Sequence, residues 1–186
     1  MRLALTFMAS GHSKRFGGDK LLTLIGGVPL AERCFRAVPG GVFDAVAVVT
    51  RSGTVAELAE KYGFAVVMNP DTTDDTSVTI RLCLEFAGNA AGCAFAVCDQ
   101  PYLTPDSYRA LAETFAAKPD CIAALSWNGA RGNPVIFPTA LFGELRSLPP
   151  GGTGGQVIDR HRALLRLAEV GDGRELRDID RIEDIM

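Results

Sequence analysis

Long apolar runs and an excess of charge of one sign are both missing from this sequence of 186 residues. No segment approaches the roughly 20 consecutive apolar residues that span a bilayer, and the short apolar start passes directly into a charged loop, which favours a first strand over a signal peptide. The 19 basic and 22 acidic residues leave a net charge of −3, which argues against a general nucleic-acid binder. We therefore expect a cytoplasmic protein whose partners include neither nucleic acid nor membrane.

Paired cysteine motifs are absent as well. The five cysteines are odd in number, have no C-x-x-C spacing and mostly lie in apolar runs: Cys34, Cys83, Cys93, Cys98 and Cys121. This pattern predicts buried, reduced thiols rather than a disulfide framework.

Apolar runs alternate with amphipathic stretches from the N-terminus to about residue 126. Continuous runs typical of strands covered on both faces occupy 3–8, 45–50, 64–68, 93–98 and 121–126. Helical patterns occupy 29–38, 53–62, 77–88 and 104–117. The alternation predicts βαβ units and an α/β fold with a doubly wound, mostly parallel sheet. The later part is less regular, with "PVIF", a helix near 139–147 and an apolar stretch at 164–170, but no linker interrupts it, so we expect one domain over 1–186.

Glycines and cations gather directly after the first run, in "FMASGHSKRFGGDKLL" at 7–22. Glycines allow successive N–H groups to point at one oxyanion, while Arg15 and Lys20 suit a polyphosphate. Two common phosphate loops are excluded, because the chain has no Gly-Lys pair and no G-x-G-x-x-G after the first strand. A phosphate-binding loop and a solvated connecting loop remain the alternatives.

Carboxylates stand at two further places. Asp99 closes an apolar strand in "VCDQPYLTP", so it should lie at the C-terminal edge of the sheet near the glycine-rich loop. A carboxylate beside a polyphosphate is repelled unless a cation lies between them, and Mg²⁺ is usually held by one or two carboxylates plus phosphate oxygens. Asp178 and Asp180 alternate in "DIDRIED", which places both on one side of an extended segment. A helix-capping Asp99 and a solvated acidic tail are the competing interpretations.

Together these stretches resemble the MobA/MocA family of nucleotidyltransferases. "MASGHSKRFGGDK" at 8–20 is similar to that family's L-A-x-G-x-S-x-R-[MF]-G-x-x-K fingerprint, and the similarity continues in "GGVPLAERCF", "CDQP", "RGNPVIF" and "DIDRIED". The last three resemble the cytidylyltransferase branch in particular. The resemblance implies a Rossmann-like fold of the nucleotide-diphospho-sugar transferase type. It also implies transfer of CMP from CTP to the phosphate of molybdopterin or molybdenum cofactor, with Mg²⁺ as cofactor and pyrophosphate as product.

The resemblance also assigns roles to individual residues. The nucleotide-binding residues that it implies are Ala9, Ser10, Gly11, Arg15, Lys20 and Ser77. The catalytic residues are Lys20, Arg15 and Asp99, the metal ligands are Asp99 and Asp180, and the acceptor-binding residues are Asn133 and Pro134. On this basis we expect Lys20→Ala to weaken nucleotide binding while leaving the folded state nearly unchanged.

One departure from the family pattern leaves the acceptor open. The family's G-D-x-G-[AG]-R reads "GGTGGQ" here, with Gly152 in place of Asp and Gln156 in place of Arg. The alternatives are a guanylyltransferase that uses GTP, transfer of NMP to another phosphorylated metabolite, and a non-catalytic accessory protein that holds molybdenum cofactor. A molybdenum hydroxylase or its chaperone would be a further partner. A phosphomonoester acceptor is already ionised near neutral pH and needs no strong general base, which suits a chain with only two histidines, His12 and His161.

Overall fold

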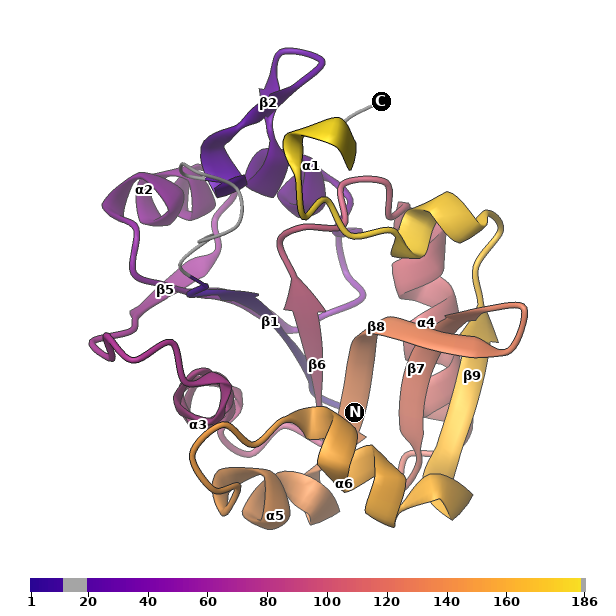
Figure 1. Cartoon of the computed structure of the whole chain (residues 1–186). Coiled ribbons are helices and arrows are strands. Elements are labelled where there is room, and N and C mark those ends of the chain that lie inside the picture. Colours follow the sequence, from indigo (N-terminus) through magenta and orange to yellow (C-terminus); the bar gives the residue numbers. More distant parts are fainter. Residues whose placement is uncertain (12–19, 185–186) are drawn as a thin grey trace.

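The structure is a computed structural model that describes residues 1–11 and 20–184. Within these residues a seven-stranded sheet runs through the molecule in the order β5-β4-β1-β6-β8-β7-β9 (Figure 1). Its strands are β1 Leu3–Ala9, β4 Ala45–Thr50, β5 Ala65–Met68, β6 Gly92–Val97, β7 Ile122–Trp127, β8 Ala130–Pro138 and β9 Leu165–Glu169. The expected α/β architecture with a mostly parallel, doubly wound sheet is confirmed.

The strand β8 is the exception to the parallel arrangement. It pairs antiparallel with both β6 and β7, while β1, β4, β5 and β6 are parallel and β9 is parallel to β7. The ladder between β7 and β8 is irregular between Ala124 and Ser126. Because β8 runs opposite to its neighbours, its first residues lie at the edge of the sheet where the parallel strands end.

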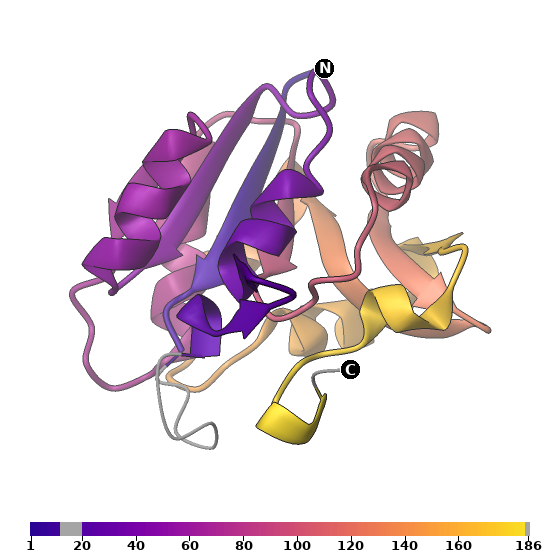
Figure 2. The same cartoon turned by 90° about the horizontal axis from the view of Figure 1, so that it is seen from above.

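Helices cover both faces of the sheet (Figures 1 and 2). The α-helices are α1 Leu30–Arg36, α2 Gly53–Lys61, α3 Thr76–Ala87, α4 Pro105–Ala117, α5 Phe142–Arg146 and α6 Gly154–Arg160. Short 3-10 helices are η1 Lys20–Leu22, η2 Thr139–Leu141, η3 Arg162–Leu164, η4 Gly173–Leu176 and η5 Ile182–Asp184. Helices α1, α2 and α4 share one apolar core with the sheet, and α3, α5 and α6 share the other. This double cover explains why the strands are apolar in continuous runs rather than in alternation.

A small hairpin and the C-terminal segment meet at one end of the molecule. The hairpin strands β2 Leu24–Ile25 and β3 Val28–Pro29 are joined by Gly26 and Gly27, whose φ angles of 58° and 80° suit a two-residue turn. The C-terminal segment passes beside this hairpin and α1, at the top of Figure 1. Two-residue strands give no periodic signal, so the sequence did not predict them.

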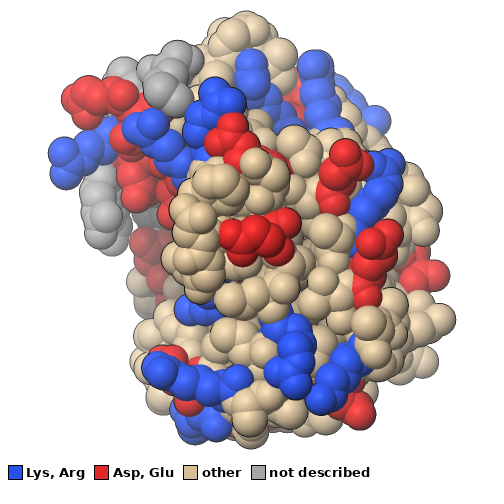
Figure 3. All heavy atoms as spheres, turned by 90° about the vertical axis from the view of Figure 1, so that its right-hand side faces the viewer, with Lys and Arg blue, Asp and Glu red and all other residues tan. Residues whose placement is uncertain are grey.

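The remaining expectations concern thiols, membranes and charge. All five cysteines are buried and none is in a disulfide. Every helix among residues 1–11 and 20–184 falls short of the length and apolar character needed to cross a bilayer. Figure 3 shows the face on the right-hand side of Figure 1, where Lys and Arg are interspersed with Asp and Glu.

Candidate active site

Lys20 joins the two carboxylates that the sequence assigned to one cation. Its Nζ donates to Asp99 Oδ2 at 3.0 Å and to Asp180 Oδ1 at 2.9 Å, although Asp180 is distant in the sequence. The side chain of Lys20 is 10% exposed, that of Asp99 is 26% exposed and that of Asp180 is 55% exposed. The two carboxylate oxygens therefore lie no further apart than two hydrogen-bond lengths, at the C-terminal end of β6.

Asp180 reaches this position because Ile179 anchors the segment that carries it. Ile179 is fully buried in a small apolar cluster with Ile25 and Leu30. Its backbone N–H donates to Asp99 O at 2.8 Å, so the segment is attached directly to the end of β6. In an extended segment, neighbouring side chains point to opposite sides, so burial of Ile179 turns Asp178 and Asp180 the other way.

A second anchor holds the same segment further upstream. Glu175 is buried, and its Oε2 accepts hydrogen bonds from Thr104 N at 3.1 Å, from Thr104 Oγ1 at 2.9 Å and from the hydroxyl of Ser107. Gln100 Nε2 donates to Leu176 O at 3.2 Å and to Asp178 Oδ1 at 2.9 Å. These bonds tie the start of α4 and the loop after β6 to the C-terminal segment.

The site carries more negative than positive charge among the described residues. Burial lowers the pKa of Lys20, but attraction to Asp99 and hydrogen bonds to Asp180 and Asp99 outweigh it, so the pKa is raised and the ammonium stays charged. Desolvation and the Asp99 carboxylate raise the pKa of Asp178. Asp99 and Asp180 thus share the ammonium of Lys20 while Asp178 lies nearby on Gln100, and the surplus of negative charge favours a further cation.

The carboxylate oxygens of the site fit a divalent cation whose coordination shell is completed by oxygens of the substrate. Asp99 Oδ1 is buried and has no hydrogen-bond partner within the part of the chain that the structure describes. No group of three or more His, Cys, Asp or Glu side chains arranged for a metal occurs in that part either. Mg²⁺ is usually held by one or two carboxylates together with phosphate oxygens and water. A metal site made of protein ligands alone needs more side chains than these two. Asp99 and Asp180 would hold such an ion.

The residues assigned to the nucleotide lie along the end of β1 and the start of α3. Ala9 and Ser10 are buried, Gly11 is exposed, and Ser10 Oγ donates to Val49 O at 3.0 Å. Ser77 is fully buried in the first turn of α3, and its hydroxyl has no partner among the described residues. Arg15 lies outside the described residues, as does His12.

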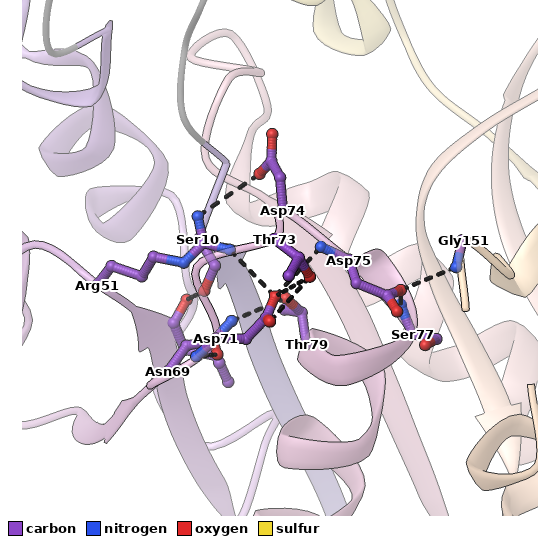
Figure 4. A network of polar contacts seen from close by, with 11 residues as sticks. Ser10, Arg51, Asn69, Asp71, Thr73, Asp74, Asp75, Ser77, Thr79 and Gly151 are labelled. Carbon is purple, nitrogen blue, oxygen red and sulfur yellow. Dashed lines mark hydrogen bonds and ion pairs between the residues drawn. The ribbon is translucent and has the colours of Figure 1, made fainter. Parts of the chain in front are cut away.

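A polar network between β5 and α3 fixes this region (Figure 4). Arg51 forms ion pairs of 3.6 Å with both Asp71 and Asp74. Asp75 Oδ1 accepts from Ser77 N at 2.8 Å and from Gly151 N at 3.0 Å, so it caps α3 and also binds the loop before α6. Asp75 thereby connects α3 with the loop that leads into α6, and residues of both helices line a cavity.

That cavity has a volume of about 330 Å³ and lies between the sheet and the helices α3, α5 and α6. Asn133, assigned to the acceptor, lines it, and Pro134 is buried next to it in the chain, after a cis peptide bond. The cavity adjoins the ends of β1 and β6, because two of its lining residues, Met8 and Val97, are register partners there.

Other candidate nucleophiles and bases are unsuited to chemistry at this site. His161 directly follows α6, and its Nε2 lies 2.6 Å from Glu144 Oε2 of α5. Burial raises the pKa of Cys98, which precedes Asp99, and that of Cys93 to about 12. Their thiols therefore remain protonated and are poor nucleophiles.

Comparison with known proteins places this geometry in a family. The family described as MobA-like NTP transferase domain matches residues 6–168, most of the chain. The chain belongs to this family. It is accordingly a nucleotidyltransferase, as the resemblance in the sequence implied.

Similar proteins match this chain over nearly its whole length. The purine catabolism protein PucB of Bacillus subtilis (strain 168) is 24% identical over 192 residues, which span 96% of this chain and 89% of PucB. Rv0371c from Mycobacterium tuberculosis H37Rv is 23% identical with a TM-score of 0.80, covering 99% of this chain and 96% of its own. Its complex with manganese matches with a TM-score of 0.67 at 21% identity, over 91% and 88% of the two chains.

A CMP:2-keto-3-deoxy-manno-octonic acid synthetase complexed with CTP has a TM-score of 0.78 at 14% identity, over 99% of this chain and 95% of its own. At this level of identity the likeness concerns the fold. The Rossmann-like fold of the nucleotide-diphospho-sugar transferase type is therefore confirmed.

Sequence reasoning missed the residues that position the site. The anchors Ile179 and Glu175 and the cap Asp75 act through long-range contacts, and nothing in their local sequence distinguishes them. Arg131 was also missed, although it lines the cavity two residues before Asn133. Its place in "RGNPVIF" was the available signal.

We expect Ile179→Ala to loosen the C-terminal segment and lower the free energy of unfolding by about 2–4 kcal/mol, because it removes a fully buried side chain. Urea titration measures the loss. Leu167→Ala is the control, since Leu167 is 42% exposed and its truncation should change stability by less than about 0.5 kcal/mol. Equal stability of the two variants would show that Ile179 is not an anchor.

Proposed function

We propose that the protein transfers CMP from CTP to the phosphate of a molybdopterin-type acceptor and releases pyrophosphate. The observation that carries the proposal is the convergence of Lys20, Asp99 and Asp180 at the sheet edge where β1 and β6 end. In open α/β sheets this edge is where ligands bind. A single domain over residues 1–186 would supply the whole site.

The chemistry requires positioning and charge neutralisation more than proton transfer. An ionised phosphate oxygen of the acceptor forms a bond to the α-phosphorus, and the bond from that phosphorus to the oxygen bridging to the β-phosphate breaks. The electron pair leaves with pyrophosphate. Lys20, whose raised pKa keeps it charged, is placed to neutralise phosphate charge, and Arg15 of the glycine-rich loop is proposed to act with it.

A divalent cation, Mg²⁺ in this proposal, would neutralise the triphosphate and orient it when bound. Asp99 and Asp180 are its proposed ligands, supported by the partnerless Oδ1 of Asp99. Ala9, Ser10, Gly11 and Ser77 are the proposed base and sugar contacts.

The acceptor is proposed to enter beside Asn133 and Pro134, in the cavity between the sheet and the helices α3, α5 and α6. The preference for CTP rests on "CDQP", "GNPVIF" and "DIDRIED", which resemble the cytidylyltransferase branch. A structural relative of the same fold was solved in complex with CTP, which is in keeping with this preference.

Thermal unfolding with each of four nucleoside triphosphates and Mg²⁺ tests the nucleotide. CTP should raise the melting temperature most, because a ligand at 100 times its Kd stabilises by about 2.7 kcal/mol. A larger shift with GTP at equal concentration would overturn the CTP assignment and favour the guanylyltransferase alternative.

Pyrophosphate release from CTP and molybdopterin tests the reaction. The proposal predicts release that requires both substrates and the metal. An accessory protein that only holds the cofactor would bind molybdopterin and release none.

A further inference from the structure

The side chain of Leu176 packs directly on the backbone of Gly132 in β8. A Cβ added at Gly132 would lie 2.8 Å from Leu176 Cδ1, 3.2 Å from Cδ2 and 3.3 Å from Cγ, all closer than ordinary van der Waals contact. Gly132 does not have a positive φ angle, so its backbone conformation does not call for glycine. The missing side chain instead leaves room for Leu176.

Gln100 holds the backbone of the same leucine from the end of β6. Its Nε2 donates to Leu176 O at 3.2 Å and to Asp178 Oδ1 at 2.9 Å, which uses both of its N–H groups. The residue is 2% exposed, and the reverse orientation of its amide would set an oxygen against a carbonyl and a carboxylate. Gln100 directly follows Asp99, so the neighbour of one proposed metal ligand binds the segment that carries the other.

The hairpin of β7 and β8 contacts this segment at a second point. A Cβ added at Gly173 would lie 2.5 Å from Trp127 Nε1 and 2.6 Å from Trp127 Cδ1, so the indole lies on the backbone of Gly173. Gly173 is the first residue of η4 and Leu176 is its last. Helix η4 is therefore held at both ends where the C-terminal segment, yellow in Figure 1, leaves β9.

The position of Asp180 depends on the backbone that leads to it. Its side chain is 55% exposed, so packing around the carboxylate itself contributes little to its placement. A ligand that is not held in place must be ordered when the ion binds, and this ordering reduces the affinity. Residues that orient metal ligands from behind are commonly worth about ten- to a hundredfold in metal affinity.

We propose that Gln100 and Gly132 are positioning residues of the metal site, which act on Asp180 through Leu176 without touching the cation. Gln100 fixes the carbonyl of Leu176 and Gly132 receives its side chain, so the backbone four residues before Asp180 is held from two strands. The inference rests on the proposed function, because it needs Asp99 and Asp180 as ligands of a divalent cation.

Two substitutions release Leu176 in different ways. Gln100→Met removes both donors while keeping the length of the side chain, and Gly132→Val occupies the space of Leu176 with a residue that suits a strand. Each should lower the affinity for Mn²⁺ about tenfold or more, measured without nucleotide by electron paramagnetic resonance of the free ion. Each should also speed hydrogen exchange at the Ile179 amide about tenfold, because the loosened segment opens its bond to Asp99 O. Circular dichroism checks that both variants are folded.

A compensating substitution tests whether the effect passes through Leu176. Gly132→Val combined with Leu176→Ala keeps the total number of side-chain carbon atoms at the contact, and volume-conserving exchanges are tolerated best. The double variant should regain most of the Mn²⁺ affinity that Gly132→Val loses. An affinity as low as that of Gly132→Val alone would show that Leu176 does not transmit the effect.

Two matched controls carry the same substitutions elsewhere. Gln156→Met changes an exposed glutamine of α6, and Gly143→Val changes a glycine of α5 at which a Cβ meets nothing within 4 Å. Both should bind Mn²⁺ as the wild-type protein does and should leave the exchange of the Ile179 amide unchanged.

The outcomes separate the positioning role from the metal site and from the reaction. Unchanged Mn²⁺ affinity in Gln100→Met and Gly132→Val would overturn the proposal even if their Ile179 amides exchange faster, because the contacts would then serve stability alone. Mn²⁺ affinity that Asp180→Asn leaves unchanged would overturn the proposed metal site and this inference with it. Mn²⁺ binding that follows the predictions, without pyrophosphate release from any acceptor, would overturn the proposed function and leave the positioning role standing.

Discussion

Asp99→Asn is expected to lower metal-dependent pyrophosphate release by at least about a hundredfold, because the variant keeps the shape of the side chain but removes the charge that would hold the cation. The side chain stands at the end of a buried strand, and its backbone carbonyl is held by Ile179 N at 2.8 Å. Its partnerless Oδ1 and its bond to Lys20 place it at the centre of the site. Asp180→Asn should be impaired less, because that side chain is 55% exposed.

The folded state of Asp99→Asn should survive. An asparagine oxygen can still accept from Lys20, and Lys20 keeps Asp180 as a charged partner. Asp159→Asn is the control, since the Asp159 side chain is 65% exposed and pairs with Arg162 on the surface. Steady-state pyrophosphate release measures activity and circular dichroism measures folding. Activity of Asp99→Asn equal to that of Asp159→Asn would remove Asp99 from the mechanism.

Lys20→Met is expected to weaken binding of CTP about ten- to a hundredfold, because charge-assisted bonds to phosphate are lost. The sequence alone predicted a folded state nearly unchanged by Lys20→Ala, whereas the two ion pairs of Lys20 predict a loss of stability. Lys20 is the cation between Asp99 and Asp180, and without it the two carboxylates repel each other. We expect the free energy of unfolding to fall by about 1–3 kcal/mol, less than for a fully buried pair, because water screens Asp180.

A divalent cation should reverse this loss. In the absence of nucleotide, Lys20→Met should bind Mn²⁺ more tightly than the wild-type protein does, because the competing ammonium is gone, and its melting temperature should rise with added metal. Electron paramagnetic resonance of free Mn²⁺ measures the affinity. Lys61→Met, an exposed position on α2, is the control. Weaker Mn²⁺ binding by Lys20→Met than by the control would contradict the inference that the metal and the ammonium of Lys20 compete for the same position.

Much of the fold could be predicted because its strands are covered on both faces. The continuous runs that became β1, β4 and β6 identify buried parallel strands, and Thr104 and Pro105 mark the start of α4. The direction of β8 could not be predicted, since a buried antiparallel strand has the same apolar run as a parallel one. Register and direction depend on pairing, which leaves no local pattern.

The site was predictable only in part, for a similar reason. Asp99 could be placed at the sheet edge because a carboxylate that closes a buried strand must emerge there. The alternation in "DIDRIED" predicts that Asp178 and Asp180 share a side, but only the burial of Ile179 brings them to Asp99. Arg131 was missed although it lies in "RGNPVIF", because an arginine before an apolar run is also typical of a solvent-exposed side chain.

The most direct test of nucleotidyl transfer follows the phosphorus atoms of CTP. The protein is incubated with Mg²⁺, molybdopterin and CTP labelled with ³²P at either the α- or the γ-phosphate, and the products are separated. The account predicts that the α-label enters the acceptor and the γ-label enters pyrophosphate. Transfer of the γ-label to the acceptor, or an acceptor that gains neither label, would contradict it.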